Sequence, residues 1–311
     1  MKIEYIITAE DAGKKLKDIL KNKLYISTIL LNDLKNTRSI FVNKNIYLVN
    51  DIVKEKDRVL IDFENMDNML NENKALFHNK FKMIDKSLDI IYEDDYLLIV
   101  NKPANMPVHP SSDNYENTLS NIVSNYLYKQ GIYTIHIVTR LDKNTTGLCI
   151  FAKHKYIQEL FIRKKDIINL QKEYICIVDG IIEDNHFIIE KNIARKEGTI
   201  ILREVNEKGD YAKTECFVID RNIDKNYTIL RILLHTGRTH QIRVHLASIG
   251  HVLLGDELYG IEYNMSDICK YIDRQALHCN KLSFNHPITN KYIELNGIMP
   301  DDINNLINEK N

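Results

Sequence analysis

The sequence predicts an α+β fold with a mixed, mostly antiparallel sheet, preceded by a small α+β domain. Three observations lead to this class. The 311 residues suffice for one domain of ordinary size and a smaller one. Short apolar runs typical of strands outnumber the amphipathic stretches typical of helices. The strands do not alternate strictly with helices, which disfavours a doubly wound parallel sheet.

Residues 1–63 are predicted to form the smaller α+β domain. Apolar residues recur at helical spacing from Leu16 to Leu20 and from Ile29 to Leu34, which indicates two short amphipathic helices. Strands are expected at 39–42 and 58–63, with a polar turn at 43–45 after the first of them.

The basic residues of this first domain allow two interpretations. Residues 1–63 carry 12 Lys or Arg against 9 Asp or Glu, a surplus of 3. Such a surplus forms either a solvated helix face or a surface that contacts phosphates. It is concentrated in Lys14, Lys15, Lys17, Lys21 and Lys23.

The rest of the chain divides into three segments. Residues 64–86 are rich in Asn, Lys, Asp and Glu without a sustained strand pattern, so we expect a linker there. Residues 87–300 are predicted to form the larger domain, and 301–311 a C-terminal tail.

The larger domain opens with a β-hairpin signal. Two apolar runs, 90–92 and 96–100, flank the acidic turn 93–95. Helices are expected at 155–164 and at 238–249, where apolar residues recur at helical spacing. Further strands are expected at 135–138, 147–152, 174–178, 229–234 and 291–295.

Charge and motif content exclude several functions. The formal net charge of −1 does not by itself indicate a nucleic-acid partner. The chain lacks the phosphate loop G-x-x-x-x-G-K-[ST], a G-x-G-x-x-G after a strand, H-E-x-x-H and G-x-S-x-G. Nucleotide hydrolysis, zinc proteolysis and α/β-hydrolase chemistry therefore have no support in the sequence.

Cysteine and hydropathy patterns favour a cytoplasmic protein. The five cysteines form no C-x-x-C pair, and we expect them to be reduced. Apolar runs stay far below the roughly 20 residues of a membrane helix. The first residues lack the apolar core of a secretory signal, so neither a membrane nor secretion is expected.

One loop carries residues suited to chemistry. The run TRLDKNTTG, residues 139–147, lies between two predicted strands. A loop that leaves a strand can hold Asp142 at the wall of a cleft, with backbone and Thr groups fixing its rotamer. Alternatively, Asp142 caps local amides in an Asx-turn and Arg140 lies on the surface.

This loop closely resembles the signature H-R-L-D-x-x-T-S/T-G of the RluA-like family of RNA pseudouridine synthases. Further segments have counterparts in that family, in the family's order, within residues 88–300. These segments are 90–109, Lys172-Glu173-Tyr174 with Gly180, 234–245, 255–260, and Leu277-His278 with 284–287. The resemblance implies the pseudouridine synthase fold and an enzyme that isomerises uridine in RNA without a cofactor.

The resemblance also implies roles for single residues. Asp142 corresponds to the family's nucleophile, and Arg243 to the cation that keeps that carboxylate ionised. Tyr174 corresponds to the residue that stacks on uracil and assists removal of the C5 proton. Arg140 corresponds to the arginine that takes part when the target base is flipped out of the RNA. Thr139 stands where the family most often has His, which leaves open any role of that His in shaping the loop or touching RNA.

Residues 13–63 resemble, more loosely, an RNA-binding domain shared with a small-subunit ribosomal protein. The resemblance rests on Gly13, Leu16, the two helices that follow, and Val42-Asn43. It favours the phosphate-contacting interpretation of the basic surplus. The residues expected to contact RNA there are Lys14, Lys15 and Lys17.

Three histidines after residue 234 do not predict a metal site. His235, His240 and His245 are spaced by five, which places them on different faces of a helix or a strand. Together with Arg238 and Arg243, and without an acidic residue in 235–245, this stretch is better interpreted as facing RNA. We therefore expect Arg238 and His240 to contact RNA and no metal to be bound.

The family resemblance favours large-subunit (23S) ribosomal RNA as the substrate, with transfer RNA as the alternative. We expect the enzyme to act as a monomer. Two other functions stay open at this stage: a non-catalytic RNA-binding factor for ribosome assembly, and a hydrolase that uses paired carboxylates.

Overall fold

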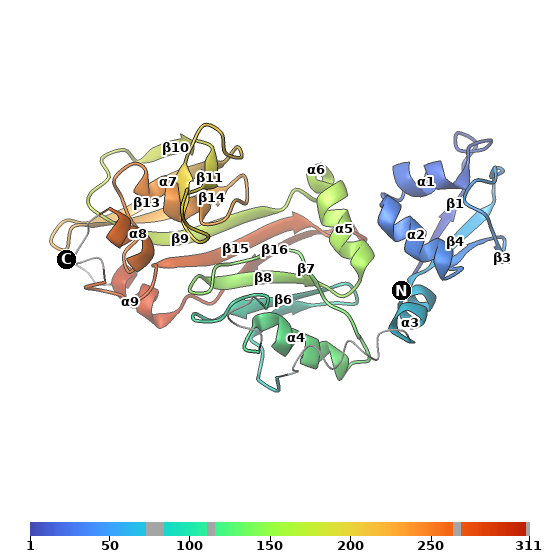
Figure 1. Cartoon of the computed structure of the whole chain (residues 1–311), viewed down its shortest axis with the longest axis horizontal. Helices are drawn as coiled ribbons and strands as arrows, with labels where there is room; N and C mark the ends of the chain where they lie inside the picture. The colour runs from blue at the N-terminus through green and yellow to red at the C-terminus, as the bar shows by residue number, and fades with distance from the viewer. Residues whose placement is uncertain (73–83, 111–115, 264–268, 309–311) are drawn as a thin grey trace.

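The computed structural model describes residues 1–72, 84–110, 116–263 and 269–308. It confirms the α+β class, with a large, mostly antiparallel sheet as its centre (Figure 1). The strand order is β10-β13-β14-β9-β15-β8-β6-β5, with β16 beside β15 and β7 beside β8. The strands are β5 (Ile90–Glu93), β6 (Leu97–Lys102), β7 (His136–Ile137), β8 (Thr146–Ala152), β9 (Gln171–Asp179), β10 (His186–Glu190), β13 (Lys213–Asn222), β14 (Tyr227–Leu234), β15 (Leu277–Asn285) and β16 (Tyr292–Asn296).

Two antiparallel halves of this sheet meet at a short parallel join. Strands β8 and β15 pair in parallel through Thr146 with His278 and Gly147 with Cys279. Gly147 has a φ of +109°, and a Cβ on it would lie 2.3 Å from the carbonyl oxygen of Cys279. Only glycine allows the two backbones to approach this closely.

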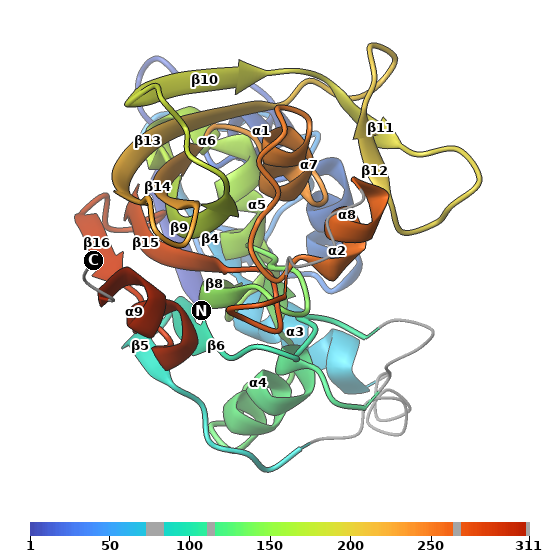
Figure 2. The ribbon, with the colours of Figure 1, turned by 90° about the vertical axis from the view of Figure 1, so that its left-hand side faces the viewer.

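Helices and a small hairpin surround the sheet, as Figures 1 and 2 show. Helix α4 lies at the β5–β6 end, where Leu119 and Val123 pack with Leu98 and Phe151. The Thr118 hydroxyl accepts a hydrogen bond from the amide of Asn121 and so caps the start of α4. The elements are α4 (Leu119–Tyr128), α5 (Lys155–Arg163), α6 (Lys165–Ile168), α7 (Gln241–Ala247), α8 (Glu257–Glu262), α9 (Asp301–Asn308), and the paired strands β11 (Ile193–Arg195) and β12 (Arg203–Val205).

The N-terminal residues form their own α+β unit with a four-stranded sheet in the order β1-β4-β2-β3. Its apolar helix residues, among them Leu16, Leu20, Leu30 and Leu34, are buried, as the helical spacing predicts. Ile29 is 68% exposed, so it lies outside that buried stripe. The elements are β1 (Lys2–Ile6), α1 (Leu16–Asn22), α2 (Thr28–Asn36), β2 (Ile40–Val42), β3 (Asn45–Ile46) and β4 (Arg58–Asp62).

The N-terminal unit packs against α5, which lies between it and the large sheet (Figure 1). The Glu159 carboxylate accepts hydrogen bonds from the backbone amide of Ser27 at 3.1 Å and from its hydroxyl at 2.6 Å. The Tyr156 ring stacks on Phe63, with centroids 4.9 Å apart. Polar and apolar contacts therefore join the two parts at one surface.

Two segments contain helices where the sequence suggested a linker and a tail. The expected linker, 64–86, overlaps helix α3 (Phe63–Glu72), and its residues 73–83 lie outside the described part. The expected tail, 301–311, contains α9, whose Ile303 and Leu306 are buried at i, i+3 spacing. Within the described residues, no helix has both the length and the apolar character needed to span a bilayer.

Candidate active site

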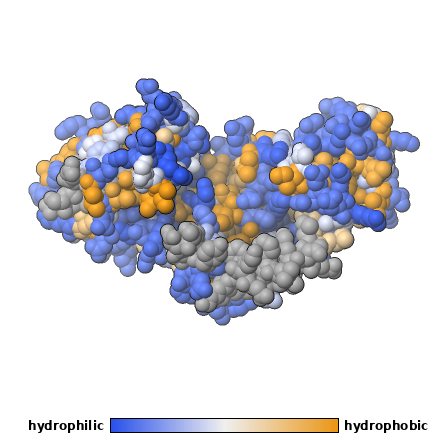
Figure 3. All heavy atoms as spheres, viewed as in Figure 1, coloured by the Kyte–Doolittle hydropathy of each residue, from blue (hydrophilic) through white to orange (hydrophobic). Residues whose placement is uncertain are grey.

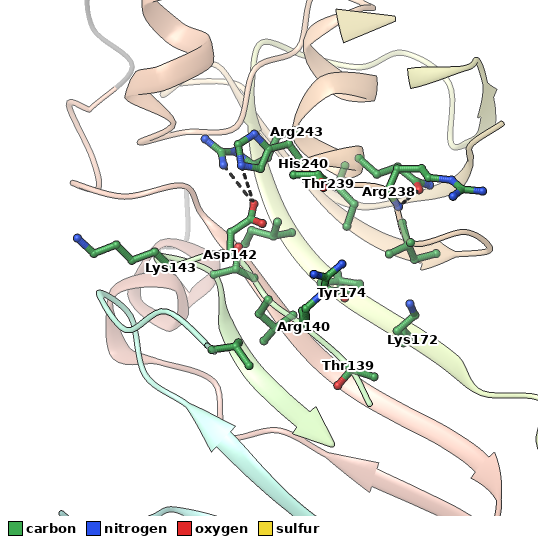
Figure 4. Close-up of a pocket in the computed structure, with 18 of the residues that line it drawn as sticks. Thr139, Arg140, Asp142, Lys143, Lys172, Tyr174, Arg238, Thr239, His240 and Arg243 are labelled. Atoms are coloured by element: carbon green, nitrogen blue, oxygen red, sulfur yellow. Dashed lines mark hydrogen bonds and ion pairs between the residues drawn. The ribbon is translucent and has the colours of Figure 1, made fainter. Parts of the chain in front are cut away.

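A cavity of about 580 Å³ opens beside the large sheet, and three parts of the chain form most of its walls (Figure 4). They are the loop after β7, the start of β9, and the segment that joins β14 to α7, and residues 107–109 after β6 and Leu277 of β15 complete the lining. In the space-filling view, a hollow with an apolar interior separates the two ends of the molecule (Figure 3). Asp142, Tyr174 and Arg243 all line the cavity, so the structure brings the three predicted catalytic residues together.

The carboxylate of Asp142 is held across the cavity rather than within its own loop. Its Oδ2 accepts a hydrogen bond from Arg243 Nη1 at 3.1 Å, and the side chain is 28% exposed (Figure 4). Locally, the Thr139 hydroxyl accepts from the Ile150 amide at 2.9 Å, and the Thr145 amide donates to the Asp142 carbonyl at 3.1 Å. The backbone thus forms a turn, while the carboxylate stays available to the cavity.

A buried lysine ties this loop to its neighbour. Lys102 Nζ donates to the carbonyls of Pro103, Met106 and Lys143, at 2.8, 2.8 and 2.9 Å. Burial lowers the pKa of Lys102 to about 8, although the Asp142 carboxylate works in the opposite direction. The residue following Asp142 is therefore fixed to the loop after β6.

A second carboxylate, that of Asp256, orients Arg243 from the side away from Asp142. Asp256 accepts from its Nε at 2.6 Å and from its Nη2 at 2.7 Å, a two-point contact that leaves Nη1 for Asp142. The Tyr259 ring lies 5.0 Å from the guanidinium carbon. Burial opposes the charge, but the bonds to Asp256, and then Asp142, raise the pKa of Arg243 overall. A permanently charged fork therefore faces the Asp142 carboxylate.

His240 is the third residue beside Asp142. Its Nε2 lies 3.8 Å from Asp142 Oδ2, and its Nδ1 lies 3.1 Å from the Tyr259 hydroxyl. Burial lowers the pKa of His240, which outweighs the attraction of Asp142, so the ring is neutral at pH 7. The backbone of His240 has a φ of +56° immediately before α7. That conformation explains why the helix begins at Gln241 and not at 238 as predicted.

Tyr174 lies in the sheet floor of the cavity, only 5% exposed. It pairs across β9 and β15 with Cys279. Burial raises the pKa of Tyr174 well above its usual value, and the neighbouring thiols add to that effect. The phenol is therefore protonated at neutral pH, with its hydroxyl hydrogen-bonded to the Cys279 thiol and its side chain on the cavity lining.

Comparison with known proteins decides the family. Residues 96–248 match the family model described as RNA pseudouridylate synthase. The chain is also 35% identical to the uncharacterized RNA pseudouridine synthase YhcT of Bacillus subtilis (strain 168), over 98% of this chain and 96% of that relative. The chain belongs to the RNA pseudouridylate synthase family.

Further comparisons agree with this membership. The chain is 35% identical to the ribosomal large subunit pseudouridine synthase D of Haemophilus influenzae, over 74% of this chain and 72% of the relative. The solved human RNA pseudouridylate synthase domain containing 1 shares the fold, with a TM-score of 0.55 and 23% identity over 70% of this chain and 86% of that one. The protein is thus an RNA pseudouridine synthase of the RluA-like type, an isomerase.

The predicted RNA contacts of this synthase fall into two groups by position. Arg140 and His240 line the cavity, as does Arg238, whose Nε donates to the Tyr211 carbonyl at 3.0 Å and whose Nη1 lies 3.6 Å from Asp210. Arg140 is exposed. All three side chains line the cavity, and His240 lies 3.8 Å from the Asp142 carboxylate.

The lysines predicted to contact RNA lie on the N-terminal unit, away from the cavity (Figure 1). Lys14 Nζ donates to the buried carboxylate of Asp11 at 3.0 Å, and Lys15 precedes α1. The Tyr5 hydroxyl, and then Lys14, lower the pKa of Asp11 to about 2. Lys14 therefore neutralises an internal charge, whereas Lys15 is exposed and Lys17 partly exposed. Their contact with RNA stays a prediction.

The three histidines of this stretch occupy separate environments. His235 Nε2 lies 2.8 Å from Glu215 Oε2 on the surface. His245 is fully buried, with its ring nitrogens 2.9 Å from the Thr214 hydroxyl and 2.9 Å from the Lys191 carbonyl. His240 alone reaches the cavity.

Sequence reasoning assigned no role to Asp256, Tyr259 or Lys102, which shape the site. Asp256 and Tyr259 lie in the family segment 255–260, and Lys102 in the segment 90–109. Those segments marked the residues as part of the resemblance. Their partners could not be inferred, because pairing with Arg243 or with three loop carbonyls depends on the folded chain.

Proposed function

We propose that this synthase converts uridines of large-subunit ribosomal RNA to pseudouridine, with Asp142 as the nucleophile. The main support is the geometry around Asp142: a carboxylate in an open cavity, paired with Arg243 and close to the buried ring of Tyr174. The names of relatives such as the large-subunit synthase D of Haemophilus influenzae favour ribosomal RNA. Transfer RNA is the alternative substrate. We place the enzyme in the cytoplasm, acting as a monomer.

The proposed reaction begins when the target uridine leaves its stack. Flipping a base costs a few kcal/mol. Arg140, exposed at the cavity opening, is suited to fill the gap that the base leaves. We also propose that residues 1–63 contact RNA outside the cavity, with Lys15 and Lys17 as the available cations.

Asp142 then forms a covalent bond with the nucleotide, at C1′ of the sugar or at C6 of the base. In either case the bond between C1′ and N1 breaks, the uracil turns, and C1′ bonds to C5. The bond to Asp142 breaks, which frees the carboxylate, and N1 takes up a proton. The C5 proton leaves last, which restores the aromatic character of the base. The ion pair with Arg243 keeps Asp142 ionised and aimed at the nucleotide.

Tyr174 is assigned to hold the uracil through ring stacking. The family resemblance also suggests that it assists removal of the C5 proton. Burial raises its pKa, so the phenol keeps its proton at pH 7. This favours stacking over proton abstraction as its larger contribution.

The test replaces Asp142 by Asn, which keeps the size of the side chain and removes the nucleophile. Turnover on ribosomal RNA transcripts should fall about 10⁴-fold or more, while RNA affinity stays nearly constant. Carbodiimide mapping of pseudouridine measures the product, with transfer RNA assayed in parallel. Asp184→Asn removes an exposed carboxylate far from the cavity and should leave turnover unchanged.

Retained turnover in Asp142→Asn would remove the nucleophile assignment. Product in transfer RNA alone would replace the ribosomal substrate. Release of free uracil would indicate a hydrolase instead. No product of the wild-type protein in either RNA would favour a non-catalytic assembly factor.

A further inference from the structure

Lys172 shares the cavity with the proposed catalytic residues, although the reaction above gives it no role. It lies on β9 two residues before Tyr174, and alternate residues of a strand face the same side. Both side chains line the cavity. Figure 4 shows Lys172 beyond Tyr174 on the side away from Asp142. Two residues of a strand at roughly 3.3 Å each separate their backbones by about 7 Å.

The ammonium of Lys172 lacks the compensation that nearby cations have. Arg243 pairs with two carboxylates, and Lys102 donates to three carbonyls. Within the described residues, Lys172 Nζ has neither a hydrogen-bond acceptor nor a carboxylate within 4.0 Å. It is a cation whose partner is not supplied by this part of the chain.

Lys172 is partly exposed, and apolar side chains line the cavity that it faces. Leu170, Leu234 and Leu277 line the same cavity. A Cβ on Gly237 would lie 3.3 Å from Lys172 Nζ, so the bare backbone of the loop after β14 lies beside the ammonium. Burial lowers the pKa of Lys172. A charge in such a place is costly unless an anion from outside joins it.

We infer that Lys172 binds a backbone phosphate of the RNA strand that carries the target uridine. Asp142 and Tyr174 are assigned to the nucleoside of the target uridine, and Lys172 lies on the far side of Tyr174 from Asp142 (Figure 4). An ammonium is a compact point charge suited to a phosphate oxygen. The inference rests on the proposed function for the RNA, and it adds a contact that positions the strand without reading its sequence.

The test compares Lys172→Met, which keeps the apolar stem, with Lys172→Arg, which keeps the charge. Binding of an oligouridine decamer is measured over a range of salt concentrations. Lys172→Met should weaken binding about 10-fold and reduce the slope of log affinity against log salt by about 0.7, the value for one single-strand phosphate contact. Lys172→Arg should restore most of the slope.

The matched control is Lys291→Met, which removes an exposed lysine in the turn between β15 and β16. Its salt slope should equal that of the wild type. On ribosomal RNA transcripts, Lys172→Met should raise KM about 10-fold and change kcat less than about 3-fold.

An unchanged salt slope with a large loss of kcat would overturn the inference and assign Lys172 to the base. An equal loss of slope in Lys291→Met would also overturn it, because the contact would then be unspecific. If Lys172→Met does not fold, the slopes of Lys172→Gln and Lys172→Arg decide in the same way. Should the wild type form no pseudouridine while these slopes still differ as expected, the proposed function fails and the phosphate contact stands.

Discussion

The charged residues beneath the cavity and those at its opening differ in what they contact. Beneath it, Arg243 and Asp256 bind each other at two points, and both are almost fully buried. At the opening, Arg140 and Lys143 are exposed, and neither side chain has a carboxylate within 4.0 Å in the described part of the chain. The buried pair therefore contributes geometry and stability, whereas the exposed cations are available to RNA. Substitutions should separate these two effects.

The largest effect is expected at Asp256. Asp256→Asn leaves the Arg243 charge with Asp142 as its remaining carboxylate, and breaking a buried pair of this kind costs about 3–5 kcal/mol. Urea denaturation at pH 7 measures the free energy of unfolding. Turnover should fall as well, because Arg243 loses the contact that aims it at Asp142.

Glu257→Gln provides the matched control for that experiment. It removes the same charge one residue later, at an exposed position of α8, and should change stability by less than about 0.5 kcal/mol. Equal losses in the two variants would contradict the distinction between buried and exposed charges.

A second effect, on the stability of the buried region beneath the cavity, depends on pH through His278. His278 is fully buried, with its Nδ1 2.9 Å from the Thr146 hydroxyl, and burial lowers its pKa to about 4. The unfolded chain binds this proton near pH 6.5, so the folded state loses stability as the pH falls from about 6.5 to about 4. The loss is about 3 kcal/mol, at 1.4 kcal/mol for each pKa unit.

Denaturation at several pH values in this window, for the wild type and for His278→Asn, isolates the contribution of the histidine. The variant should lose less stability on acidification than the wild type. Parallel pH curves for the two proteins would show that the imidazole is not held neutral by its surroundings.

The smallest effect on stability is expected at the opening. Arg140→Ala should change the free energy of unfolding by less than about 0.5 kcal/mol, because the side chain is exposed. The kcat/KM for ribosomal RNA should nevertheless fall by about 10-fold if the guanidinium fills the gap that the flipped base leaves. Arg163→Ala, at the end of α5, removes an exposed arginine outside the cavity and should leave kcat/KM unchanged. If Arg140→Ala lowered the free energy of unfolding as much as Asp256→Asn, the distinction between exposed and buried charges would fail.

The sequence predicted those features that depend on residues close together in the chain. The loop around Asp142, the strand with Tyr174 and the helix with Arg243 were each found, and the structure brings them to one cavity. Local patterns also predicted α5 within one residue and most central strands. β10, β13 and β15 were not predicted. In β13, Glu215 and Asp220 flank an apolar run of only four residues without apolar and polar alternation, although Cys216 is fully buried.

Contacts between distant residues were harder to predict. Arg243 and Asp142 lie 101 positions apart, and the family resemblance alone suggested their pairing. Asp256 gave no signal of its own, since a carboxylate at the start of a helix is equally suited to cap local amides. The contact between Ser27 and Glu159 joins parts 132 positions apart that the sequence treats as separate domains.

The short parallel join between β8 and β15 has a consequence for how the enzyme can vary. Asp142 lies in the loop that leads into β8, in one half of the sheet. Tyr174 lies on β9 and Arg243 on the helix that follows β14, in the other half, and the two backbones are in contact at Gly147. Even a methyl group there would wedge the halves apart and shift the acid relative to its arginine. Gly147 has no reactive side chain, yet it sets the alignment of Asp142 with Arg243. Substitutions of this glycine should therefore lower turnover first.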